Sequence, residues 1–95
     1  MNQQLEKLKK IVGDQVLDLD LYLDPGHGWL SIPKNLSFGL EFSKYSYQDK
    51  THYYLEEDLD MSLWLDLVHS VGIKTSYTEK TTNEDSFIRD LNRIA

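Results

Sequence analysis

The 95-residue sequence has no cysteine, only two prolines and five glycines, and ten basic residues against 16 acidic ones. Without cysteine the chain cannot form disulfides, cysteine-ligated zinc sites, iron–sulfur clusters or a thiol nucleophile. No apolar run approaches the roughly 18 residues of a membrane span, and residues 1–10 lack the apolar core of a secretory signal. We therefore expect a cytoplasmic protein that does not bind a membrane.

The shortage of basic residues gives a formal net charge of −6, and the acidic residues are clustered. Nine of the 16 carboxylates lie in two segments without Lys or Arg: Asp14, Asp18, Asp20 and Asp24 in the first, and Glu56, Glu57, Asp58, Asp60 and Asp66 in the second. An acidic surface repels nucleic-acid phosphate and favours a basic partner. A net negative charge can also serve only to keep a small domain in solution. We expect no direct binding to nucleic acid.

The first half of the chain predicts a helix followed by two strands. Hydrophobic residues make up 40% of the sequence, enough for one modest core, so residues 1–95 are expected to form a single domain. Apolar residues recur at helical spacing in Gln3–Val12, and they alternate strictly with polar ones in Val16–Asp24. Strict alternation indicates one buried and one solvated face, which is typical of an antiparallel sheet. Pro25–Gly28 contains the proline and glycines that are typical of a turn, and Trp29–Ile32 is predicted to return as the second strand.

The second half predicts a Tyr-rich hairpin, a helix, a strand and a final helix. The hairpin pairs Phe42–Tyr47 with Thr51–Glu57, the helix begins at Asp58 or Asp60 and ends at Gly72, and the strand covers Ile73–Thr78. The final helix is capped by Asp85 or Ser86, and its apolar stripe consists of Phe87, Ile88, Leu91 and Ile94. The predicted fold is therefore α+β: a small two-layer domain with an antiparallel sheet of about four to five strands and helices packed on one face.

The turn itself resembles a catalytic motif. Leu23–Gly28 (LDPGHG) resembles the opening of zinc-dependent N-acetylmuramoyl-L-alanine amidases, which would make His27 a zinc ligand and the chain a zinc hydrolase. However, Trp29 replaces the second glycine of that motif, and neither His52 nor His69 has a ligand-like spacing to His27. The residues favour a structural turn, and the zinc hydrolase remains an alternative.

The tyrosines of the hairpin offer a second alternative. Tyr45, Tyr47, Tyr53 and Tyr54 could stack the bases of a single-stranded nucleic acid. Tyrosine is also common in half-buried strands for packing reasons alone. The net charge favours this structural role.

Five motifs in order carry a resemblance across most of the chain: DPGHGWL at 24–30, IP at 32–33, YSYQ at 45–48, YLEED at 54–58 and SxIR at 86–89. Together they resemble a family of small proteins carried by phages, plasmids and integrated elements. That resemblance supplies no catalytic residues. It implies a small acidic protein that binds and inhibits or modulates a host factor, as anti-restriction and anti-CRISPR proteins do.

These observations lead to one hypothesis for the function. We expect a non-enzymatic protein, without a catalytic residue, metal or cofactor, that binds a protein partner with a basic surface. The oligomeric state is left open. The expected partner-binding residues are Asp18, Asp20, Asp24, His27, Trp29, Tyr47, Glu56, Glu57, Asp58 and Asp60.

Overall fold

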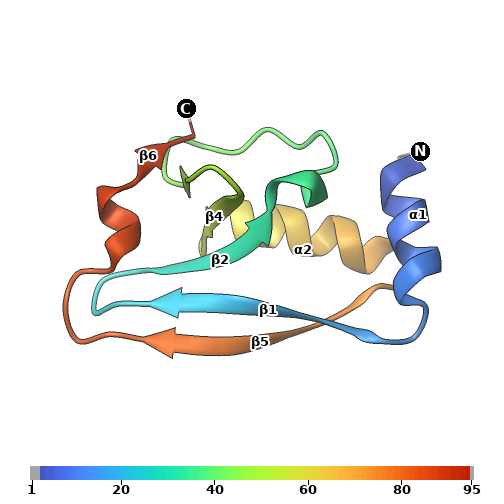
Figure 1. Ribbon diagram of the computed structural model, residues 1–95, viewed down its shortest axis with the longest axis horizontal. Helices are drawn as coiled ribbons and strands as arrows, with labels where there is room; N and C mark the ends of the chain where they lie inside the picture. Colours follow the sequence, from blue (N-terminus) through green and yellow to red (C-terminus); the bar gives the residue numbers. More distant parts are fainter. Residues whose placement is uncertain (1–2, 95) are drawn as a thin grey trace.

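The computed structural model describes residues 3–94 (Figure 1). Its two α-helices are α1 (Gln3–Val12) and α2 (Asp60–Ser70). Its strands are β1 (Val16–Leu23), β2 (Gly28–Pro33), β3 (Tyr47–Gln48), β4 (His52–Glu56), β5 (Lys74–Thr81) and β6 (Asn92–Arg93). Two short 3-10 helices, η1 (Lys34–Leu36) and η2 (Phe87–Asp90), follow β2 and precede β6. Over the described range, neither helix has the length and apolar character needed to cross a bilayer.

The six strands form one mixed sheet in the order β5-β1-β2-β4-β3-β6. All neighbouring strands are antiparallel except β1 and β5, which are parallel from Val16 opposite Lys74 to Leu23 opposite Thr81. The expected α+β class is confirmed. The sheet differs from the predicted one, which was wholly antiparallel with four to five strands, because it has six strands and one parallel pair. The difference arises because α2 carries the chain from β4 past β2 and β1 to the far edge, and such a crossover returns the next strand in the same direction.

The leucines of β1 lie on the face that packs against both α-helices, which we call the leucine face. Leu19 on β1, Leu30 on β2 and Leu55 on β4 are buried there against Trp64 and Val68 of α2. The alternating pattern of β1 therefore produces the predicted two layers, since every second side chain points to the same side of the sheet. Figure 1 shows α2 behind the strands and α1 at one end of them.

The opposite face carries a second, smaller core, the aromatic cluster. It consists of Trp29, Tyr54 and Ile88, with Tyr22, Tyr47 and Leu91 packed against it. The predicted C-terminal helix was wrong, because the segment is instead η2 followed by the short strand β6. This shape lets Ile88 insert into the cluster while Asn92 pairs with Gln48 of β3.

The first strand of the predicted Tyr-rich hairpin is much shorter than expected. Only Tyr47–Gln48 pair with β4, and the preceding residues run without regular structure. The buried carboxylate of Asp60 accepts the backbone N–H of Ser43 and the hydroxyl groups of Ser43 and Ser46. These hydrogen bonds to the Asp60 side chain take the place of backbone hydrogen bonds to a neighbouring strand, so the segment lies against the start of α2.

Two isoleucines provide a matched test of the leucine face. Ile32 of β2 is fully buried in this core, whereas Ile11 of α1 is 79% exposed. We expect Ile32→Ala to lower the free energy of unfolding by about 2–5 kcal/mol, and Ile11→Ala to change it by less than about 0.5 kcal/mol. Urea unfolding followed by circular dichroism measures both values. Equal losses would contradict this assignment of the core.

Candidate functional site

The site begins at the turn between β1 and β2, which is organised by Asp24. Its Oδ1 accepts hydrogen bonds from the backbone N–H groups of Gly26 (3.0 Å) and His27 (2.9 Å). The backbone N–H of Asp24 donates to the carbonyl of His27 at 2.9 Å. This is the Asx-turn geometry that favours aspartate before a tight corner. Gly28 lies close to Glu57, since a Cβ at this position would be 2.7 Å from Glu57 Oε2 and would displace that side chain.

The same carboxylate holds the C-terminal segment onto the turn. Arg89 donates to both of its oxygens, from Nε to Oδ2 at 2.7 Å and from Nη2 to Oδ1 at 3.0 Å, and the backbone N–H of Ser86 donates to Oδ2 at 3.0 Å. The Asp24 side chain is fully buried. The hydrogen bonds from Arg89, followed by those from backbone N–H groups, outweigh burial and hold the pKa of Asp24 well below its usual range. We call this arrangement the Asp24 clamp.

Two arginines stack on rings of the aromatic cluster, and one of them, Arg89, also belongs to the clamp. The guanidinium of Arg89 lies over the Trp29 ring at 5.3 Å, and that of Arg93 lies over Tyr47 at 5.4 Å. Trp29 and Tyr47 meet edge to face with their centroids 6.1 Å apart. Such cation–π and aromatic contacts fix the position of both guanidinium groups.

Asp49 fixes the position of Tyr54, another ring of the aromatic cluster. The hydroxyl of Tyr54 donates to Asp49 Oδ2 at 2.6 Å. This bond and the N–H groups of Thr51 and His52 lower the pKa of Asp49 to about 2. Burial and the bond to Asp49 raise the pKa of Tyr54 above its usual value. The tyrosine therefore remains a neutral donor at ordinary pH.

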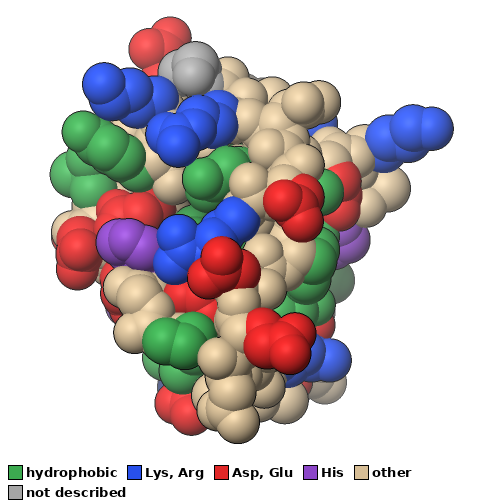
Figure 2. Space-filling model, turned by 90° about the vertical axis from the view of Figure 1, so that its left-hand side faces the viewer, with side chains coloured by type: hydrophobic (Ala, Val, Ile, Leu, Met, Phe, Trp, Pro, Cys, Tyr) green, Lys and Arg blue, Asp and Glu red, His purple; other side chains and the backbone are tan. Residues whose placement is uncertain are grey.

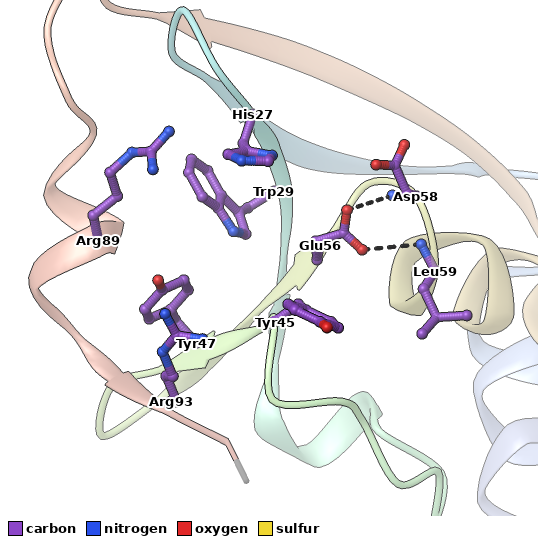
Figure 3. Close-up of a pocket in the computed structure, with 9 residues that line it drawn as sticks. All are labelled: His27, Trp29, Tyr45, Tyr47, Glu56, Asp58, Leu59, Arg89 and Arg93. Carbon is purple, nitrogen blue, oxygen red and sulfur yellow. Dashed lines mark hydrogen bonds between the residues drawn. The ribbon is translucent and has the colours of Figure 1, made fainter.

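These elements surround a pocket of about 420 Å³ at one end of the molecule (Figure 3). Its walls come from four parts of the chain: His27 and Trp29, Tyr45 and Tyr47, Glu56, Asp58 and Leu59, and Arg89 and Arg93. Figure 2 shows this end of the molecule, where acidic, basic, histidine and hydrophobic side chains are interspersed. The surface around the pocket is therefore mixed in charge.

The acidic segment between β4 and α2 divides into buried and exposed carboxylates. Glu56 is buried and accepts the N–H groups of Asp58 (2.9 Å) and Leu59 (3.1 Å) at the start of α2. Asp60 is 2% exposed and holds the preceding loop. Glu57 and Asp58 are exposed, and within residues 3–94 neither makes an ion pair.

The structure brings together five of the ten expected partner-binding residues. His27, Trp29, Tyr47, Glu56 and Asp58 all line the pocket. Asp24 and Asp60 lie inside the fold with their carboxylates occupied, and Glu57 stands beside the turn at Gly28. Asp18 accepts hydrogen bonds from Ser76 and Thr78 of β5, and Asp20 lies 4.0 Å from Lys80, so these two carboxylates belong to a different part of the sheet.

Four residues of the pocket were not among the expected ones: Tyr45, Leu59, Arg89 and Arg93. Arg89 and Arg93 are the only arginines in the sequence, a signal that could have drawn attention to them. Both lie in the segment that was predicted to form the final helix, which the structure replaces with η2 and β6. The position of Tyr45 depends on the bonds of its loop to Asp60, which no local pattern indicates.

The alternative sites gain no support from this arrangement. Within the described residues, no three of the side chains that commonly bind metals come together around an ion-sized space. The four tyrosines of the predicted hairpin also diverge: Tyr53 packs on Phe42 at the leucine face, and Tyr54 is buried in the aromatic cluster. They do not form one stacking platform.

Comparison of the chain with models of protein families, with curated proteins and with solved structures found no match.

The Asp24 clamp predicts a specific dependence of stability on pH. Because folding lowers the pKa of Asp24 below its unfolded value of about 3.9, its contribution is present above that pH and is lost as the pH falls below it. We expect Asp24→Asn to lower the free energy of unfolding at pH 7 and to flatten its decline between about pH 5 and pH 2. Chemical denaturation at a series of pH values measures both effects.

Asp85→Asn is the matched control. Its carboxylate lies 4.0 Å from the same Arg89 Nε but is 89% exposed. We expect this variant to keep the wild-type profile, because exposed ion pairs contribute little. If Asp24→Asn had the same free energy of unfolding as the wild type at pH 7, the clamp would not be a structural anchor.

Proposed function

We propose that this chain is a non-enzymatic binding protein that engages a protein partner through the pocket. The observation that carries the proposal is the set of residue types found there: one Trp, two Tyr and two Arg around a single open hollow. These three types supply most of the binding energy at protein interfaces, and they tend to lie at the centre of the contact.

The surroundings of the pocket extend this contact surface. Leu59 is 55% exposed on its wall, and Leu63, one helical turn further along α2, is 43% exposed. Tyr45 is 54% exposed on the same wall. An apolar rim next to an aromatic pocket is the arrangement expected of a site that a partner covers.

The charge of the chain favours a partner with a basic surface. Glu57 and Asp58 stand exposed at the edge of this site without a counter-ion in the described part of the chain. The net charge of −6 acts in the same direction at longer range. Such charges steer a basic protein toward the site and repel nucleic acid.

The motif resemblance suggests the kind of partner. A small acidic protein of a phage or plasmid would bind a host protein that handles nucleic acid, for example a restriction or CRISPR complex, whose basic groove normally binds phosphate. Binding of this kind would take place in the cytoplasm and would need neither a metal nor a cofactor.

Charge reversal at Glu57 and Asp58 tests the proposal. After the partner is captured from a host lysate and purified, we expect Glu57→Lys combined with Asp58→Lys to slow association on the order of tenfold at low salt. Added salt should remove most of this difference, because screening suppresses steering between exposed charges. Surface plasmon resonance at several salt concentrations measures both effects.

The control is Glu79→Lys combined with Glu84→Lys. These two exposed carboxylates lie on β5 and in the loop after it, outside the pocket lining, and the net charge changes by the same amount. Equal slowing by the two double variants would leave only a general effect of net charge and would count against the site. If neither double variant changed the association rate, the electrostatic part of the proposal would be wrong.

A further inference from the structure

Trp29 has an unsatisfied hydrogen-bond donor at the pocket. The residue is 2% exposed, and its Nε1–H is the one buried side-chain N or O group in residues 3–94 without a hydrogen-bond partner. The other tryptophan shows the usual arrangement, because Trp64 Nε1 donates to the carbonyl of Leu36 at 2.7 Å. A buried donor without an acceptor is rare and costly, so it calls for an explanation.

The carboxylate that the indole nitrogen faces is already engaged within the fold. Figure 3 shows the indole nitrogen on the edge of the ring that faces the interior of the pocket, toward Tyr45 and Glu56. Both oxygens of Glu56 accept backbone N–H groups at the start of α2. The lining therefore leaves this donor free for an acceptor that enters from outside.

The two arginines differ in how far their charge is balanced. Arg89 is neutralised by Asp24. Arg93 donates from Nη1 to the backbone carbonyl of Lys44 at 3.1 Å, and it makes no ion pair with any residue in the described range. Lys44, which lies over the ring of Tyr45 at 5.5 Å, has no ion pair there either. The side of the pocket formed by Tyr45, Tyr47 and Arg93 is therefore positive.

We propose that the pocket binds a carboxylate of the partner together with the apolar part of the residue that carries it. The carboxylate accepts a hydrogen bond from Trp29 Nε1 and lies in the field of Arg93, while its apolar part rests on Tyr45 and Leu59. The inference depends on the proposed function in one respect, namely that the carboxylate belongs to the partner. A phosphate dianion fits less well, because Glu57 and Asp58 are exposed at the opposite edge and repel a second negative charge.

Access to the donor requires a small movement of the pocket wall. The nitrogen itself has almost no exposed surface. Tyr45 is the wall residue suited to move, because the residue is 54% exposed and its ring meets the side chain of Lys44, whose Nζ lies 5.5 Å from the ring centroid. Rotation of an exposed ring is fast compared with binding.

The two indole N–H signals in a ¹⁵N-correlated NMR spectrum test the proposal directly. We expect titration with N-acetyl-L-leucine to shift the Trp29 signal and leave the Trp64 signal in place, whereas N-acetyl-L-leucinamide, which lacks the carboxylate, shifts neither. The α-amide of N-acetyl-L-glutamate separates the two sources of the group. A shift with this probe indicates a side-chain carboxylate, and a shift with N-acetyl-L-leucine alone indicates a chain terminus.

Arg93→Gln should weaken the binding of the acidic probe about tenfold, since it removes the positive charge that attracts the carboxylate. Lys74→Gln, which removes an exposed positive charge on β5 outside the pocket lining, should leave the affinity unchanged. An unmoved Trp64 signal confirms that each variant is folded. The proposal is overturned if neither acidic probe shifts Trp29, or if the amide shifts it as strongly as the acid. Because these probes need no partner, that result is distinct from a failure to find one.

Discussion

One buried carboxylate, that of Asp24, connects the parts of this protein that form the pocket. It closes the turn between β1 and β2 through two backbone N–H groups and holds η2 through Ser86 and Arg89. A buried carboxylate is tolerated only when donors surround it, so the turn and the C-terminal segment stabilise each other. That segment supplies Ile88 to the aromatic cluster and both arginines to the pocket.

The same requirement explains why the second acidic segment is less acidic at the surface than its sequence suggests. Glu56 and Asp60 point inward and accept N–H and O–H groups from the start of α2 and from the loop before β3. Glu57 and Asp58, between them, point outward. Asp66 is also exposed, further along α2, and Glu57 and Asp58 form a short acidic edge beside an aromatic pocket that contains an unbalanced arginine. A partner would therefore meet charge of both signs, and binding would depend on the match of individual groups.

The local parts of the fold were largely predictable. The alternation in β1, the helical spacing in α2 and the turn at Pro25–Gly28 all depend on neighbours in sequence, and each appears close to its expected boundaries. Errors occurred where a segment depends on distant residues. The parallel pairing of β5 with β1 needs the α2 crossover, and the replacement of a C-terminal helix by η2 and β6 needs the aromatic cluster and an open edge on β3.

The sequence by itself determined which faces are apolar, where the chain turns and how much acid it carries, because periodicity and turn chemistry are properties of adjacent residues. Only the tertiary structure decided which carboxylates reach solvent and which side chains meet. The bonds from Arg89 to Asp24 span 65 residues, and the indole of Trp29 lacks an acceptor because of what the fold places around it. Hydrogen-bond partners and pockets depend on distances between remote segments, and no local pattern encodes those distances.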